Sequence, residues 1–423
     1  MQFETDSGVI VKRLLPSFKK CKPNTKKGLK GITDALYVGF SEGEKYYRSR
    51  ISPVKANVRA NGNITYPNMF GHHFMPTNVK EYIEEKIAYQ LEYQCKILER
   101  NITIRIGLFT ADELMKLDKY EQYVSFMCIW LYNCIQNAGT GFGSASCKQL
   151  TIYFYPTTMK KKLPSRKADV IGVEHVNSAL TFRCTRNTSD IIIYRLEEWK
   201  KVFIHETFHT FGFDIQPHIE TDVHALLETK FNVRTKLSVS EAYTETWARI
   251  INAAYASYHS TQKNGEGPEQ FSIYLDFSLQ MERIFSLLQM HKILGFLDMN
   301  YHGLWKTRKG ERSTKSSSLI PLIPYEKHVT YKEDPNTNAF GYYIVTAILM
   351  NGYAEFMLWC GQHNTSGSLL KFPGTSLISR EFVKMIEKCF HKEQCDLNGV
   401  FTVDKRDRFL KKTARMSAIE LFD

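Results

Sequence analysis

The segment that constrains this chain most is His205-Glu206-Thr207-Phe208-His209, in which two histidines stand four residues apart with a glutamate between them. Residues four apart lie on one face of a helix, so both imidazoles can point to one metal ion. Glu206 then stands beside the metal, where it can take a proton from a water and later pass it to a leaving group. The pattern HExxH therefore predicts a zinc site on a helix, with His205 and His209 as ligands and Glu206 as general base and acid.

The residues around the motif favour a helix that ends close to it. Residues 191–194 form a β-branched run that predicts a strand, and residues 195–204 have apolar side chains at helical spacing. Gly212 suits a helix C-terminus. The motif should therefore lie near the end of its helix, facing an open cleft. The alternative interpretation is an ordinary amphipathic helix with two core histidines.

A catalytic zinc also needs a third protein ligand and an open fourth position. In the extended pattern HExxHxxGxxH, Gly212 fits, but the last ligand position is Ile215, which cannot bind zinc. Asp214 is one residue out of register. His218, His224 and His259 are alternative third ligands.

A second acidic segment offers a better third ligand. Ser238 and Glu241 form a capping box, which predicts that a helix begins there. Glu241 and Glu245 are four residues apart, so they share a face of an otherwise apolar helix. Two carboxylates in that setting are costly unless a cation lies near them.

HETFH followed by a helix with Glu-x-x-x-acid resembles the gluzincin metallopeptidases. The resemblance implies one Zn²⁺ held by His205, His209 and Glu241, with Glu245 accepting the free ring N–H of His205. The second acid is Glu where Asp is more usual, so the roles of Glu241 and Glu245 could be exchanged. The 31 residues between His209 and Glu241 imply an insertion, placed at 217–232 as a loop and short helix.

The same resemblance implies an α+β fold with a zincin-like arrangement of two lobes. Residues 76–215 would form a mixed-sheet upper lobe that ends in the HExxH helix. Residues 216–423 would form a mainly helical lower lobe with the third-ligand helix and a basic C-terminal tail. Residues 1–75, rich in Lys, Gly and Asn, are expected to form a basic irregular arm or β-rich extension, with a strand-like run at 35–40.

Apolar patterns place the remaining elements. Strands are expected over 102–109, 150–155 and 176–182, and helices over 79–100, 110–135, 238–256, 269–296, 338–360 and 379–390. Residues 305–337, which contain three prolines, are expected to form a loop. The strand at 176–182 is the candidate cleft edge, where Asn177, Ser178 and Ala179 would pair with an extended peptide. An ordinary internal strand is the alternative.

Hydrolysis of an amide also benefits from a hydrogen-bond donor to the developing oxyanion. The candidates from the lower lobe are His328, Tyr331, Tyr342 and Tyr343. The sequence does not choose among them.

Charge and composition suggest the partners and the compartment. The net charge of +12 is concentrated near residues 19–30, 160–167, 306–315 and 405–415, which could attract polyanions or acidic proteins. Solvated loops are the alternative. The chain shows no signal peptide and no run of membrane-spanning length, so an intracellular peptidase acting on a peptide or protein substrate is expected.

Two further expectations concern the cysteines and a different class of function. Nine scattered cysteines without a CxxC pair suggest reduced thiols and no cysteine-based zinc site. The phrases HETFHTFGFD and SEAYTETWARIIN resemble uncharacterised proteins of large DNA viruses. The alternative function is a structural or virion-assembly protein on a metallopeptidase scaffold, in which the basic patches, the N-terminal arm and the many aromatic residues make contacts within the assembly. The chain would then reside in a virion.

Overall fold

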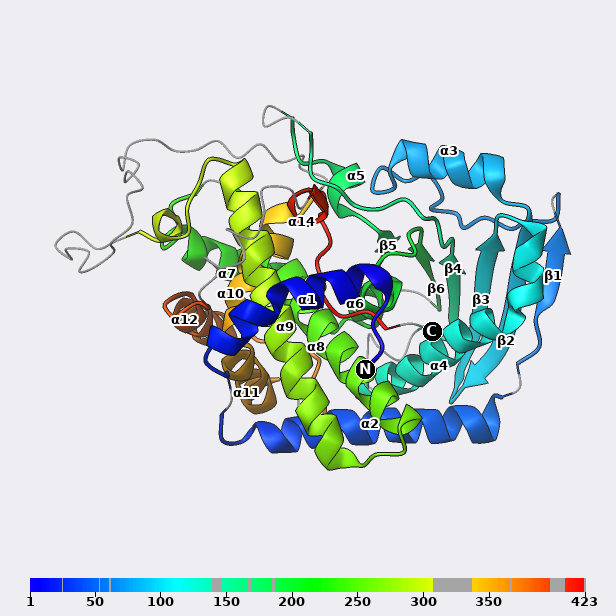
Figure 1. Ribbon diagram of the computed structural model, residues 1–423, viewed down its shortest axis with the longest axis horizontal. Coiled ribbons are helices and arrows are strands. Elements are labelled where there is room, and N and C mark those ends of the chain that lie inside the picture. The colour runs from blue at the N-terminus through cyan, green and yellow to red at the C-terminus, as the bar shows by residue number, and fades with distance from the viewer. Residues whose placement is uncertain are drawn as a thin grey trace.

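The computed structural model has an α+β architecture in which a sheet and its covering helices meet a mainly helical region (Figure 1). It describes residues 1–24, 26–52, 54–60, 62–138, 147–165, 169–184, 187–233, 235–306, 337–364, 367–395 and 408–421.

Six strands form one mixed sheet in the order β1-β2-β3-β4-β6-β5. Their bounds are β1 (Asn57–Ala60), β2 (Tyr89–Ile97), β3 (Arg100–Leu108), β4 (Gln149–Phe154), β5 (Ala179–Thr181) and β6 (Thr188–Ile193). β3, β4 and β6 pair in parallel, while β1 and β2 on one side and β5 on the other pair antiparallel. β5 is therefore an edge strand with one side free of sheet pairing.

The helices are α1 (Thr5–Lys20), α2 (Leu29–Arg50), α3 (Thr77–Lys86), η1 (Ala111–Lys116), α4 (Leu117–Ala138), α5 (Val173–Val176), α6 (Trp199–Phe211), α7 (Pro217–Glu228), α8 (Val239–Lys263), α9 (Pro268–Phe296), η2 (His302–Leu304), η3 (Phe340–Val345), α10 (Thr346–Asn351), α11 (Tyr353–His363), α12 (Ile378–Phe390) and α14 (Arg408–Lys412). In Figure 1 the sheet lies at one end of the molecule, and α7, α10, α11 and α12 gather at the other. α6 contacts β5 and β6 on one side and α8 on the other, so it joins the two regions.

Most elements with strong patterns are confirmed. The predicted strands at 102–109, 150–155 and 191–194 correspond to β3, β4 and β6, and the helices at 269–296 and 379–390 correspond to α9 and α12. The short helix expected in the insertion is α7. The lobe boundaries stay predictions, and the loop expected at 305–337 lies almost entirely outside the described residues.

Several sequence predictions are wrong. Residues 1–75 contain two long helices, α1 and α2, instead of an irregular or β-rich arm. The strand-like run at 35–40 lies inside α2, whose buried residues are just Phe40 and Gly43, so it carries little amphipathic pattern. The helix expected at 79–100 ends with α3, because the next residues pair with β3 as strand β2. The helix expected at 338–360 is broken, with an 89° bend between Asn351 and Tyr353.

The prediction of a basic C-terminal tail is also wrong for residues 413–421. Residues 413–421 run through the protein interior, and Arg415 is 1% exposed. The Arg415 guanidinium pairs with Glu420 at 2.7 Å, and Glu282 Oε1 accepts the backbone N–H groups of Ala418 and Ile419 at 2.9 Å each. Met416 lines the same cavity as His205. The C-terminal segment at 413–421 is therefore part of the core, while residues 396–407 lie outside the described residues.

The carboxyl group that holds this segment should make stability depend on pH. Burial raises the pKa of Glu282 from 4.5 to about 7, against the opposing effect of Arg249. The folded state therefore binds more protons than the unfolded chain between about pH 4.5 and 7, so the free energy of unfolding falls as pH rises through that window. The side chain of the Glu282→Gln variant cannot ionise. As pH rises from 4.5 to 7, the free energy of unfolding of this variant should therefore rise by about 1–3 kcal/mol relative to that of wild type.

The measurement is the free energy of unfolding in urea, determined for wild type and variant at about pH 4.5 and about pH 7. Glu42→Gln, which alters an exposed side chain on α2, is the matched control. A Glu282→Gln curve that runs parallel to wild type across the window would contradict the assignment.

Four of the nine cysteines are paired, so the prediction of nine reduced thiols is wrong. Disulfides join Cys21 to Cys395 and Cys147 to Cys184, while the other five cysteines are free. The pairs are 374 and 37 residues apart, and such pairing is set by tertiary contacts that spacing does not reveal.

Among the described helices, none has by itself the length and apolar composition of a membrane span. The bent pair Phe340–Asn351 and Tyr353–His363 meets that test when its two parts are taken together.

Candidate metal centre

Helix α6 presents the two histidines of the HExxH motif. Nearly all of its residues are buried, because it packs against the sheet and α8. It ends at Gly212, whose φ of 64° is left-handed and whose N–H donates to the carbonyls of Phe208 and His209. Glycine adopts this conformation without strain, so the helix ends directly after the second histidine.

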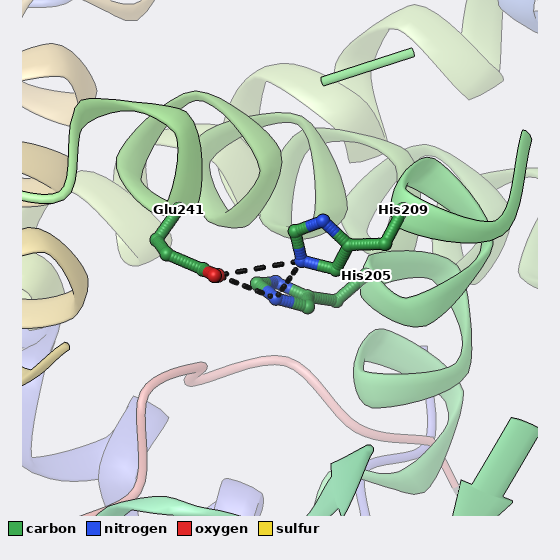
Figure 2. A group of neighbouring side chains, drawn as sticks. All are labelled: His205, His209 and Glu241. Carbon is green, nitrogen blue, oxygen red and sulfur yellow. Dashed lines mark hydrogen bonds and ion pairs between the residues drawn. The ribbon is translucent and has the colours of Figure 1, made fainter. Parts of the chain in front are cut away.

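Glu241, in the first turn of α8, meets both histidines (Figure 2). Its Oε2 lies 3.2 Å from His205 Nε2 and 3.3 Å from His209 Nε2, and the two Nε2 atoms are 3.1 Å apart. These three residues are the group of His, Cys, Asp or Glu side chains among the described residues that could hold a metal ion. The start of α8 is as predicted, but Ser238 makes no cap hydrogen bond; its Oγ contacts Asn338 Oδ1 at 2.7 Å.

The second nitrogen of His205 is held by a buried carboxylate. His205 Nδ1 lies 3.1 Å from Glu245 Oε2, and Glu245 also accepts from Lys201 Nζ and Arg249 Nε at 3.0 Å each. Although burial opposes it, the cations Lys201 and Arg249 hold the pKa of Glu245 well below its usual range. Glu245 thus contacts the far side of the His205 ring, and Glu241 contacts the side that faces His209.

The second nitrogen of His209 is held in the same manner by Asp214, which the sequence reasoning considered only as a misplaced ligand. His209 Nδ1 lies 3.0 Å from Asp214 Oδ2, and Arg183 pairs with the other carboxylate oxygen. The turn at Gly212 brings Asp214 back against the helix end. The signal was present in the sequence, since an acid five residues after a ligand and just beyond a glycine can return to it.

These contacts test whether the site suits a cation. If each ring donates its Nδ1–H to a carboxylate, each neutral ring turns a lone pair at Nε2 toward Glu241 Oε2. Three acceptor atoms that converge in this way repel one another unless a cation lies among them. Although burial opposes it, Glu241 and Asp214 raise the pKa of His209 well above its usual value, so without a metal a proton on His209 supplies the positive charge that the site favours. Two imidazoles and one carboxylate are a donor set that zinc prefers.

Replacing Asp214 by Ala should weaken zinc binding by about 10- to 100-fold, because the His209 ring loses the partner that orients it. The measurement is zinc affinity by competition with a chromogenic chelator. Asp222→Ala, at an exposed position on α7, is the matched control. Equal zinc affinity for the two variants would show that Asp214 does not position His209.

Glu206 lies in the wall of a cavity of about 120 Å³ that His205, His209 and Glu241 also line. Burial raises the pKa of its carboxyl group, against the opposing effect of the two histidines. A carboxylate with a raised pKa in a small cavity is suited to accept a proton and to release it again.

The predicted edge residues lie in the same cavity wall. Asn177, Ser178 and Ala179 line the cavity, and Ala179 begins edge strand β5. The observed strand is shorter than the expected 176–182, because residues 173–176 form the short helix α5. Ser178 Oγ is buried without a hydrogen-bond partner among the described residues.

The four candidate oxyanion donors differ in position. The Tyr342 hydroxyl donates to Glu241 Oε2 at 3.0 Å and lines the cavity. Tyr343 points elsewhere, since its hydroxyl donates to the carbonyl of Ala414. His328 and Tyr331 lie outside the described residues.

The alternative third ligands are not in the metal-binding group. His218 and His224 are on α7, where His224 pairs with Glu228 at 3.7 Å, and His259 stacks on Tyr255 near the end of α8. Lys201 and Met416 are among the cavity-lining residues that sequence reasoning missed. Lys201 is one helical turn before His205, and Met416 comes from the C-terminal segment.

Comparison of the chain with protein-family models, with curated proteins and with solved structures finds no significant match.

Proposed function

We propose that this protein is a zinc-dependent peptidase with a gluzincin-like site on a zincin-like fold. The observation that carries the proposal is the convergence of His205, His209 and Glu241 in one cavity with Glu206. Three protein ligands leave a fourth position for water or substrate, which distinguishes a catalytic zinc site from a closed structural one.

Zinc in this site would supply Lewis acidity toward a water molecule and the scissile carbonyl. Glu206 accepts the proton of the attacking water and transfers it to the leaving amine. Glu245 and Asp214 keep the two histidine rings oriented. Tyr342, whose pKa burial raises well above 10, stays a phenol and is the candidate donor to the oxyanion.

Edge strand β5 is the proposed binding site for the peptide backbone. Its free side can pair with an extended chain, and residues 177–181 line the cavity that contains Glu206. The cavity lining includes no residue from the described parts of 1–60, so α1 and α2 do not form its wall.

The experiment is metal analysis combined with peptide cleavage. Purified protein should contain about one zinc per chain, the number that a single site holds. Cleavage of a mixed peptide library should stop after chelation and return with added zinc. Protein that binds no zinc, or cleaves equally well without it, would rule out the proposal.

A further inference from the structure

A second cavity lies beside the metal centre. Its volume is about 410 Å³, and its wall includes Lys160, Lys162, Glu174, His175 and Arg195. These residues come from the segment before and within α5 and from the turn after β6. We call this cavity the basic groove.

The lining of the groove contains more basic than acidic side chains. Lys162 is exposed and has no ion-pair partner among the described residues, whereas Lys160 pairs with Asp6. The buried Arg195 guanidinium donates to the carbonyls of Met159, Glu174 and Asn177 at 2.8 to 3.0 Å. Carbonyl oxygens satisfy its N–H groups, and the carboxylates of Glu174 and Glu197 act on its charge without forming an ion pair with it. Lys162 is therefore the cation of the wall that an anion can reach.

The acidic side chain in the lining does not cancel this charge. Glu174 Oε1 lies 3.3 Å from His175 Nδ1, and the Glu174 side chain is half exposed. The lining thus combines one carboxylate with one arginine and two lysines, of which Lys160 is already paired with Asp6. Among the lining residues there is no Phe, Tyr or Trp on which a nucleic-acid base could stack.

The groove and the metal cavity share a wall. Glu174 and His175 line the groove, and the next residues, 176–181, line the metal cavity. Residues 160–162 also alternate between the two cavities. Lys160 and Lys162 line the groove, and Lys161 lines the metal cavity. α5 and β5 lie next to each other in Figure 1, so a peptide extended along β5 past Asn177 would reach the groove.

We propose that the basic groove binds an acidic segment of the peptide substrate, at a distance from the bond that is cut. This inference rests on the proposed peptidase function and specifies its substrate class. Aspartate or glutamate side chains of the bound peptide pair with the exposed Lys162. The site thereby selects acidic proteins for cleavage.

The test measures peptide binding by the full-length, zinc-loaded Glu206→Gln protein, which does not require turnover. A fluorescent peptide with four consecutive acidic residues should bind about fivefold more tightly than its Asn/Gln counterpart. Raising the salt from about 50 to about 300 mM should shrink that preference, because screening weakens exposed charge pairs. Lys162→Glu should abolish it, and Lys162→Gln should reduce it.

Lys96→Glu, an exposed charge reversal on β2, is the matched control and should keep the preference. Equal binding of the two peptides, equal effects of the Lys96 and Lys162 reversals, or displacement of the acidic peptide by a short oligonucleotide would each overturn the inference. The two proposals fail separately. Zinc-dependent cleavage without acidic preference removes the groove assignment, while acidic preference without any cleavage removes the peptidase assignment.

Discussion

Replacing Glu206 by Gln should lower kcat by about 10²- to 10⁴-fold, the usual contribution of a general base and acid, while leaving the metal bound. Gln has nearly the shape of Glu and can occupy the same cavity wall. It cannot take a proton from water or return one to the leaving amine. Glu206 lines the cavity but is not in the metal-binding group and makes no hydrogen bond or ion pair with either histidine among the described residues, so zinc content should not change.

Peptide cleavage and zinc content are measured on the same preparation. Glu228→Gln, a half-exposed position on α7, is the matched control and should behave as wild type. Wild-type activity should decline at acid pH, since a protonated Glu206 cannot accept a proton from the water. Full turnover in Glu206→Gln would assign the base to another residue.

The local part of the site could be predicted because helical spacing alone determines it. His205 and His209 share a face in any helix, and Gly212 indicates where that helix ends. Glu241 also follows from spacing, since it begins a strongly patterned helix whose other acid is four residues away. The same locality explains why β3, β4 and β6 could be predicted from apolar runs.

The partners that hold these residues could not be predicted, because they meet through tertiary contacts. Lys201 has the spacing of an ordinary solvent-facing lysine, but it is 3% exposed and pairs with Glu245 from another helix. Met416 lies near the end of a basic stretch, which favoured a solvated tail. The segment is instead bound by Glu198 and Glu282, two buried acids far from it in sequence.

Neighbouring lysines of the basic stretch at 160–167 differ in burial. Lys161 is buried and pairs with Glu198 at 2.7 Å, while its neighbour Lys162 is exposed in the groove. Arg166 and Lys167 lie outside the described residues. A charge count over the stretch therefore predicts a patch, but only burial distinguishes the lysine that stabilises the core from the one available to a partner.

The two glutamates of α8 should give opposite results when each is replaced by Gln. Glu241→Gln removes the carboxylate that faces both Nε2 atoms, so the protein should no longer retain zinc through purification. Its fold should change little, because Glu241 lies at the cavity and its partners there are the two histidines and Tyr342.

Glu245→Gln should keep zinc with an affinity about 10- to 100-fold lower, since the His205 ring loses its charged partner. Its main effect should be on stability. Lys201 and Arg249 are 3% and 1% exposed and would lose the carboxylate between them, at a cost of about 3–5 kcal/mol. Glu245 pairs with a lysine and an arginine besides the histidine, whereas Glu241 pairs with neither residue type among the described residues.

Zinc content after gel filtration and urea unfolding of the metal-free proteins separate the two effects. The metal-free state matters because bound zinc would itself stabilise the fold and hide the difference. Exchanged ligand roles predict the reverse pattern, with zinc retained in Glu241→Gln and absent from Glu245→Gln. Since Glu245 Oε2 contacts His205 Nδ1 while Glu241 Oε2 contacts both Nε2 atoms, the geometry favours Glu241 as the ligand and Glu245 as the residue that orients His205.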